Sequence, residues 1–153
     1  NVSKLEQDKE KAKELIKENI ENGKSLKKFK EIIKYQGGNP DIIDNINSLN
    51  ISKKKIYIKS KKKGYINYIK TKQLGNIVKE LGGGRNFIEE KIDNSVGIEV
   101  LKKIGDHVKY NEEVCIIYYN KEKNLEDIIN KVEDSFLMSE EKKEKEKTIL
   151  EIF

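Results

Sequence analysis

The sequence predicts an α+β fold in which a helical segment precedes a region of mixed strands and helices. Two observations carry this prediction. Apolar residues recur at helical spacing over the first part of the chain, whereas from Lys55 onward they alternate as in strands. Glycine pairs and a glycine triplet interrupt the pattern where elements should end. We therefore expect two domains, a helical one over residues 1–50 and a second one over residues 51–153.

Two helices are expected in the first domain, and together they should form a hairpin. Ser3 and Glu6 have the spacing of a capping box, so the first helix should begin there and end before Gly23. Ser25 should cap the second helix, which ends at Gly37-Gly38. The apolar positions of the two helices are Leu5, Ala12, Leu15, Ile16 and Ile20, and then Leu26, Phe29, Ile32 and Ile33.

A short third helix and two strands come next. Asn39-Pro40 can open the helix, because Pro loses no hydrogen bond at the first helical position and Asn caps well. Residues 56–58 and 65–69 should be strands joined at a turn near Gly64.

The rest of the chain should alternate between helix and strand. Thr71 should cap a helix that ends at Gly82-Gly83-Gly84, and Gly105-Asp106 should form a turn. The expected strands are residues 96–101, 107–108 and 114–119, followed by a helix over 125–132 and by edge strands at 135–138 and 148–153. The segment from Glu140 to Lys147 is charged at every position.

The composition excludes several classes of protein. The 153 residues are 39% charged with a formal net charge of +5, but the apolar residues are clustered and periodic, which favours a folded chain. One Cys excludes a disulfide framework. No apolar run approaches the roughly 20 residues of a membrane span, and the first residues lack the apolar segment of a secretory signal. We expect a cytoplasmic protein with no membrane partner.

A lysine-rich stretch suggests one alternative function. Lysines at positions 53–55, 59 and 61–63 are interleaved with Tyr57, Tyr65 and Tyr68, a combination that can bind phosphates and stack on bases. Lysines on strand edges also block edge-to-edge pairing without any ligand. The chain is rich in Ile and Asn as well as Lys, as a genome biased toward adenine and thymine would make it. We therefore expect no nucleic-acid partner.

The run Gly82, Gly83, Gly84 and Arg85 has the composition of a phosphate-binding loop. Successive glycines expose backbone N–H groups, and a guanidinium suits an oxyanion. However, the run follows the C-terminus of a predicted helix, whose partial negative charge repels anions. A mobile or tightly turning connection is the favoured interpretation, with Arg85 able to pair with Glu89, Glu90 or Asp93.

No set of residues forms a recognisable catalytic or metal site. Cys115 is the only Cys and alternates with strand neighbours, so we expect it in the core. His107 is the only His and follows the predicted turn, where an exposed structural role is expected. Neither a nucleophile elbow nor a Walker motif is present. The residues alone therefore predict a module that is not catalytic by itself.

Four stretches, taken in order, resemble the C-terminal part of the pyrimidine-nucleoside phosphorylases, which include thymidine phosphorylase. The resemblance extends from about Lys13 to Phe153. The stretches are Glu21–Phe29 with Gln36-Gly37-Gly38, Lys63–Ile66, Leu81–Arg85 with Ile92–Ile98, and Lys102–Val108, which contains the family's Gly-Asp-x-Val turn.

This resemblance implies a pentosyltransferase that uses inorganic phosphate to cleave a pyrimidine nucleoside into free base and pentose 1-phosphate. The chain would be roughly the last third of such an enzyme: residues 1–50 the tail of its helical connection, and residues 51–153 its C-terminal α/β-hammerhead domain, which is barrel-sandwich-like. Nucleoside, phosphate and dimer contacts would belong to the upstream part of a homodimeric enzyme. The chain itself would hold no cofactor and no catalytic residue.

Within that resemblance, the expected role of this domain is one wall of the interdomain cleft. Gly82, Gly83, Gly84 and Arg85 are the residues expected to face the cleft. The chain alone should be inactive. A biotinyl or lipoyl carrier is the alternative by architecture, but the tetrapeptide around a modified Lys is absent.

Overall fold

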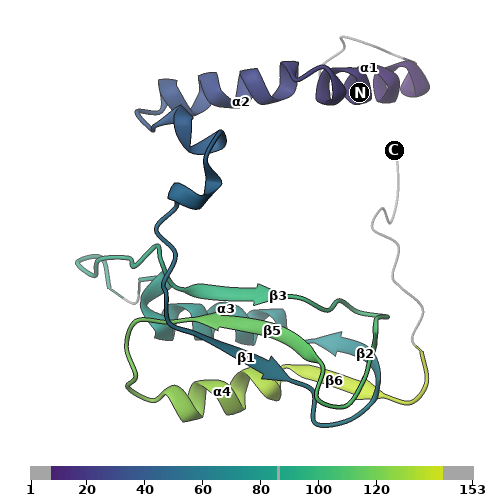
Figure 1. The fold of residues 1–153 in the computed structure, drawn as a ribbon, viewed down its shortest axis with the longest axis vertical. Helices are drawn as coiled ribbons and strands as arrows, with labels where there is room; N and C mark the ends of the chain where they lie inside the picture. Colours follow the sequence, from purple (N-terminus) through teal and green to yellow (C-terminus); the bar gives the residue numbers. More distant parts are fainter. Residues whose placement is uncertain (1–7, 86, 143–153) are drawn as a thin grey trace. The chain divides into compact units, whose positions relative to one another are not determined.

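The structure is a computed structural model that describes residues 8–85 and 87–142. The chain divides into two compact units, one ending at Leu49 and the other beginning at Asn50. The first unit is helical, and the second contains two β-sheets with accompanying helices (Figure 1). This content confirms the predicted α+β class.

The first unit begins with helix α1 (Lys9–Glu21). Asp8 is its N-cap, because the Asp8 carboxylate accepts hydrogen bonds from the N–H groups of Glu10 at 2.9 Å and Lys11 at 3.2 Å. The predicted capping box at Ser3 and Glu6 lies outside the described residues.

Helix α2 (Lys24–Tyr35) starts earlier than predicted. Ser25 lies inside the helix and is not its cap. The cap is Gly23, which adopts a left-handed conformation with φ of 78°. The Asn22 side chain accepts a hydrogen bond from the Lys24 N–H at 3.0 Å, which satisfies one of the N–H groups of the first turn.

The two helices do not form the predicted hairpin. They follow one another and do not pack along their lengths (Figure 1), and neither contains a buried residue. Leu15 and Phe29, for example, remain 48% and 50% exposed. Helical spacing makes each helix amphipathic, but it does not determine that the two apolar faces meet.

Two short 3-10 helices complete this unit, η1 (Pro40–Ile43) and η2 (Ile46–Ser48). Asn39 caps η1 as predicted, accepting a hydrogen bond from the Asp41 N–H at 2.9 Å.

The second unit contains two three-stranded antiparallel sheets. The first has the order β1-β5-β3, formed by β1 (Lys55–Lys59), β5 (Glu113–Tyr118) and β3 (Gly97–Val100). The second has the order β4-β2-β6, formed by β4 (His107–Val108), β2 (Gly64–Ile69) and β6 (Phe136–Ser139). The helices are α3 (Thr71–Val78), a π-helical turn η3 (Lys79–Gly83) and α4 (Leu125–Glu133).

The first two predicted strands are present and are joined by a short connection, but they do not pair with each other. β1 pairs with β5, whereas β2 lies in the other sheet between β4 and β6. Ser60 starts the connection, and its N–H donates to Glu112 O at 2.8 Å, which directs the chain away from a hairpin. Gly64 is the first residue of β2, where an added Cβ would lie 2.5 Å from Ser139 O.

The remaining predicted elements are largely confirmed. Strands β3, β4, β5 and β6, helix α4 and the turn at Gly105, with φ of 85°, lie where the sequence predicts them. Thr71 is the first residue of α3 and not its cap, which is Lys70. The predicted strand at residues 148–153 lies outside the described residues, as does most of the charged segment 140–147.

Both sheets and both α-helices of the second unit share one core. Its least exposed members come from β2, α3, β4, β5 and α4, and they are Ile66, Ile77, Val108, Cys115, Ile117 and Val132. Burying apolar surface in this way is the main source of stability. None of the helices in residues 8–85 and 87–142 is long and apolar enough to cross a membrane.

Candidate functional site

The predicted glycine loop is a tight turn at the end of α3. The helix widens into η3, and Gly82 adopts φ of 103°, a conformation that side-chain-bearing residues rarely adopt. Gly82 O accepts a hydrogen bond from the Asp93 N–H at 2.9 Å. The turn is therefore attached to the segment that leads into β3.

Gly83 and Gly84 are required for close packing. A Cβ at Gly83 would lie 2.8 Å from Val78 Cγ1 and 3.4 Å from Val96 Cγ2, and one at Gly84 would lie 2.6 Å from Lys79 Cγ. The three glycines thus have structural roles that need no ligand. The favoured interpretation of the run as a tight turn is confirmed.

Arg85 follows the turn and is exposed. Within the part of the chain that the structure describes, Arg85 forms no ion pair. The predicted partner Asp93 is engaged elsewhere, since its carboxylate accepts hydrogen bonds from Ser95 and Asn120.

A polar network holds the turn against the first sheet. Asp93 accepts from the Ser95 N–H at 3.0 Å and from the Ser95 hydroxyl at 2.6 Å, and the Asn120 amide donates to Asp93 Oδ2 at 2.7 Å. Asn120 also donates to Ser95 Oγ at 2.8 Å. These bonds lower the pKa of Asp93, the Ser95 hydroxyl contributing most and Asn120 next.

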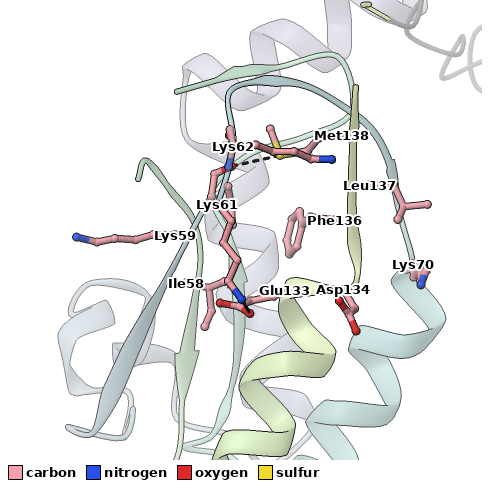
Figure 2. A pocket seen from close by; sticks show the side chains of 12 residues that line it. Ile58, Lys59, Lys61, Lys62, Lys70, Glu133, Asp134, Phe136, Leu137 and Met138 are labelled. Carbon is pink, nitrogen blue, oxygen red and sulfur yellow. Dashed lines mark hydrogen bonds and ion pairs between the residues drawn. The ribbon is translucent and has the colours of Figure 1, made fainter. Parts of the chain in front are cut away.

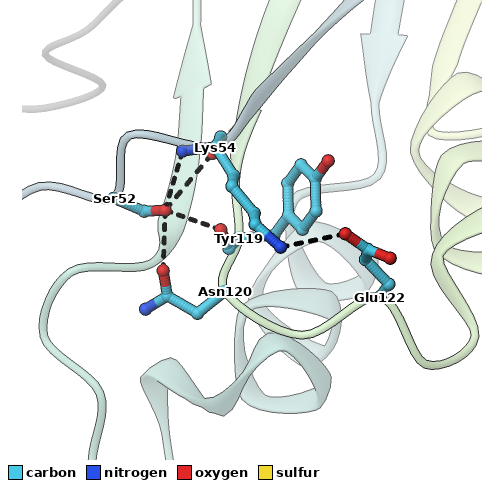
Figure 3. Close-up of polar contacts among 5 residues, drawn as sticks. All are labelled: Ser52, Lys54, Tyr119, Asn120 and Glu122. Atoms are coloured by element: carbon cyan, nitrogen blue, oxygen red, sulfur yellow. Dashed lines mark hydrogen bonds and ion pairs between the residues drawn. The ribbon is translucent and has the colours of Figure 1, made fainter.

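The network continues to the chain entering β1 (Figure 3). The Ser52 hydroxyl lies 2.6 Å from Tyr119 O and 2.8 Å from Asn120 Oδ1, and the Ser52 N–H donates to Ser95 O at 2.8 Å. Next to it, Lys54 Nζ lies 2.9 Å from Glu122 Oε1, which raises the pKa of Lys54 and lowers that of Glu122. The network therefore joins the entry to β1, the end of β5 and the glycine turn.

Sequence reasoning missed Ser52 and Asn120 as members of this site. They are 68 residues apart in the chain, and the strands that bring them together pair non-locally. No local motif marks either residue. The one signal in the sequence is that Asp93 and Ser95 lie in Ile92–Ile98, a stretch that resembles the pyrimidine-nucleoside phosphorylases.

A hollow of about 320 Å³ lies beside the turn. It is lined by Glu80, Leu81, Lys121, Lys123, Asn124 and Ile128. The charge of Glu80 is balanced by Lys131, whose Nζ lies 3.0 Å from the Glu80 carboxylate. The charges that remain in the lining are those of Lys121 and Lys123, so the rim of this hollow is basic.

The other candidate residues have structural surroundings. Cys115 is fully buried, and burial raises the pKa of its thiol to about 12. His107 is exposed and packs edge-to-face on Tyr65, with ring centroids 4.9 Å apart. No group of three or more metal-ligating side chains occurs among residues 8–85 and 87–142.

The lysine-rich stretch is partly neutralised. Lys54 pairs with Glu122 and Lys61 with Glu133, and Lys55 Nζ lies 5.1 Å from the centroid of the Tyr57 ring. A lysine that is already paired contributes less to phosphate binding, because it exchanges one anion for another. The geometry adds nothing in favour of a nucleic-acid surface here.

Comparisons with known proteins identify the family. Residues 65–139 match the model of the pyrimidine nucleoside phosphorylase C-terminal domain. The pyrimidine-nucleoside phosphorylase of Staphylococcus haemolyticus is 37% identical over 126 residues, which are 82% of this chain and 29% of that protein. The Bacillus subtilis enzyme of the same name is 36% identical over 132 residues, 86% of this chain and 30% of that protein.

The matches cover most of this chain but less than a third of each relative. The chain spans about 30% of the length of the curated relatives it matches. The match to the Bacillus subtilis protein covers more residues than the second unit contains, so it also includes part of the helical unit. The chain belongs to the pyrimidine-nucleoside phosphorylase family, and its residues 65–139 correspond to the C-terminal domain of that family.

Proposed function

We propose that this chain supplies the C-terminal domain of an enzyme that cleaves a pyrimidine nucleoside with inorganic phosphate, giving free base and pentose 1-phosphate. The observation that carries the proposal is the match to pyrimidine-nucleoside phosphorylases over more than four-fifths of the chain. Since most of each relative lies outside the match, the groups that bind nucleoside and phosphate would be supplied there. The chain alone is accordingly expected to be inactive.

In this proposal, residues 1–50 are the tail of the helical connection and residues 51–153 the C-terminal domain. Two three-stranded sheets with one shared core support an α/β-hammerhead, barrel-sandwich-like architecture for the second part. The complete enzyme would be a cytoplasmic homodimer, with its dimer contacts outside this chain.

The domain would form one wall of the interdomain cleft and move as a rigid body. Support comes from the network of Ser52, Asp93, Ser95 and Asn120, which ties the glycine turn to the first sheet. A turn held in this way moves with the whole domain. Closure would then exclude water and bring the two substrates together.

Arg85 is the side chain through which the turn would act. It is exposed and forms no ion pair with another described residue. A hydrogen bond from a guanidinium to a phosphate or carboxylate becomes stronger when water is excluded, because the local dielectric constant falls. Arg85 would stabilise the closed state from the wall of the cleft, whereas the glycines would shape the turn that carries it.

The first test is an assay for phosphorolysis. The purified chain is incubated with uridine or thymidine and phosphate, and release of free base is measured. No release is expected, and release by the chain alone would overturn the division of labour proposed here.

The second test uses a chimera of the Bacillus subtilis relative in which residues 51–153 of this chain, the proposed C-terminal domain, replace the matching C-terminal segment. Phosphorolysis should persist in the chimera. Arg85→Gln should lower kcat/KM by about tenfold, the loss expected for one charge-assisted contact of about 1.4 kcal/mol. The matched control is Lys72→Gln, an exposed charge on α3, which should leave kcat/KM unchanged. Equal kcat/KM for the two variants would contradict the proposal that the glycine turn faces the cleft. An inactive but folded chimera would contradict the domain assignment.

A further inference from the structure

A second pocket in the C-terminal unit is separate from the glycine turn. It has a volume of about 400 Å³ and lies between the end of β1, the end of α4 and strand β6 (Figure 2). None of the residues Gly82–Arg85 lines it. This volume falls within the range of small-molecule sites in proteins.

The inner surface of this pocket is apolar. Ile58, Val114 and Phe136 line it and are each less than a tenth exposed, and the thioether of Met138 lies beside them. A ligand that covers these side chains removes apolar surface from water, which favours binding in proportion to the area covered.

Hydrogen bonds hold the walls of the pocket in place. The buried Ser60 hydroxyl donates to Lys62 O and lies 3.3 Å from Met138 Sδ, which links the β1–β2 connection to β6. The Lys70 N–H donates to Ser135 O at 2.9 Å on the opposite side. Because the backbone is anchored on both sides, a ligand would enter a preformed site at little cost in ordering.

The rim of the pocket carries excess positive charge. Lys61 is paired with Glu133 at 2.5 Å, and the Lys59 side chain points away from the pocket (Figure 2). This leaves Lys62, Lys70 and Asp134, none of which forms an ion pair with another described residue. Together these three side chains give the lining one net positive charge beyond the Lys61–Glu133 pair.

We propose that this pocket binds an organic anion with an apolar, preferably aromatic, body, such as an aromatic carboxylate, sulfonate or phosphate ester. The apolar surface would cover the body, and Lys62 and Lys70 would pair with the acidic group. Neither part suffices by itself, because lysines in water bind small anions weakly and a neutral ring gains nothing from the charged rim. This site is independent of the proposed phosphorolysis.

The test is a titration of the full chain with 2-naphthoate, followed by ¹H–¹⁵N correlation spectra. The amide signals of Ser60, Lys62, Phe136 and Met138 should shift together with one dissociation constant. Two ligand controls separate the two parts of the proposal: 2-naphthalenemethanol has the same ring without charge, and acetate has the charge without the ring. Both should bind about threefold to tenfold more weakly, and added salt should weaken the binding of the two anions but not that of the alcohol.

A pair of double variants tests the lysines. Lys62→Gln with Lys70→Gln should weaken naphthoate binding by about threefold to tenfold. Lys53→Gln with Lys103→Gln removes the same net charge from exposed positions outside the pocket and should leave the affinity unchanged. The spectra also report whether each variant is folded. Equal affinity for the two double variants, equal affinity for the neutral alcohol, or shifts confined to helices α1 and α2 would each overturn the proposal.

Discussion

The hydrogen-bond network around Asn120 allows a quantitative prediction for Asn120→Ala. The Asn120 side chain takes part in three hydrogen bonds of 2.7 to 2.8 Å, with Ser52, Asp93 and Ser95. A typical hydrogen bond contributes about 0.5–1.5 kcal/mol net, so a simple addition over three bonds gives about 1.5–4.5 kcal/mol. Ser52 and Ser95 keep other partners after the substitution, and water can reach Asp93. We therefore expect a loss of about 1–2 kcal/mol in the free energy of unfolding.

Thermal and urea denaturation of the full chain, followed by circular dichroism, would measure this loss. For a unit of this size, 1–2 kcal/mol corresponds to a decrease in Tm of about 5–9 °C. The matched control is Asn130→Ala on α4, where the side chain is exposed and makes no hydrogen bond to the described residues. The reasoning is refuted if Asn120→Ala unfolds within about 0.5 kcal/mol of the parent, or no earlier than the Asn130 control.

Three further predictions follow from individual side chains and glycines. Gly82→Ala should destabilise the chain by about 1–2 kcal/mol because of the positive φ, whereas Gly75→Ala, in the open middle of α3, should stabilise it by about 0.5–1 kcal/mol; urea midpoints with the opposite order would contradict this. Asp93 has a lowered pKa in the folded chain, so its contribution is present above the unfolded value near 3.8 and is lost as the pH falls through the lower folded value. Unfolding curves at pH 7 and pH 3 should therefore differ less for Asp93→Asn than for the parent, and an equal difference would count against the network. The Cys115 thiol, with its pKa raised to about 12, should resist iodoacetamide at pH 8 until urea unfolds the chain, and rapid native labelling would show that it is not buried.

Local pattern predicted the elements of the C-terminal unit well. A short apolar run predicted β5 with Cys115 in the core, where four consecutive residues are buried, and helical spacing predicted α4. The glycine triplet predicted a tight turn, although the reason differs at each position: positive φ at Gly82 and close packing at Gly83 and Gly84. These features depend on neighbours within a few residues, which a sequence displays directly.

Pairing and packing were not predictable in the same way. The sequence predicted two strands joined at a turn, but it did not indicate their partners, which lie far along the chain: β1 pairs with β5, and β2 pairs with β6. Amphipathic spacing suggested that α1 and α2 form a hairpin, but their apolar faces do not meet. The spacing of apolar residues identifies the apolar face of a helix or strand, but it does not identify the element that covers this face.

The amino-acid sequence by itself determined the family, the α+β class and the position of the glycine turn, because each rests on residue identities and short-range spacing. Only the tertiary structure decided that Ser52 and Asn120 meet beside that turn, and that the lysines of residues 59–70 lie beside Phe136 and Met138 around one apolar pocket. Both depend on antiparallel pairing between strands separated by tens of residues. Which strands pair is selected by burial of the whole core and not by any one segment, so it becomes visible only when the fold is complete.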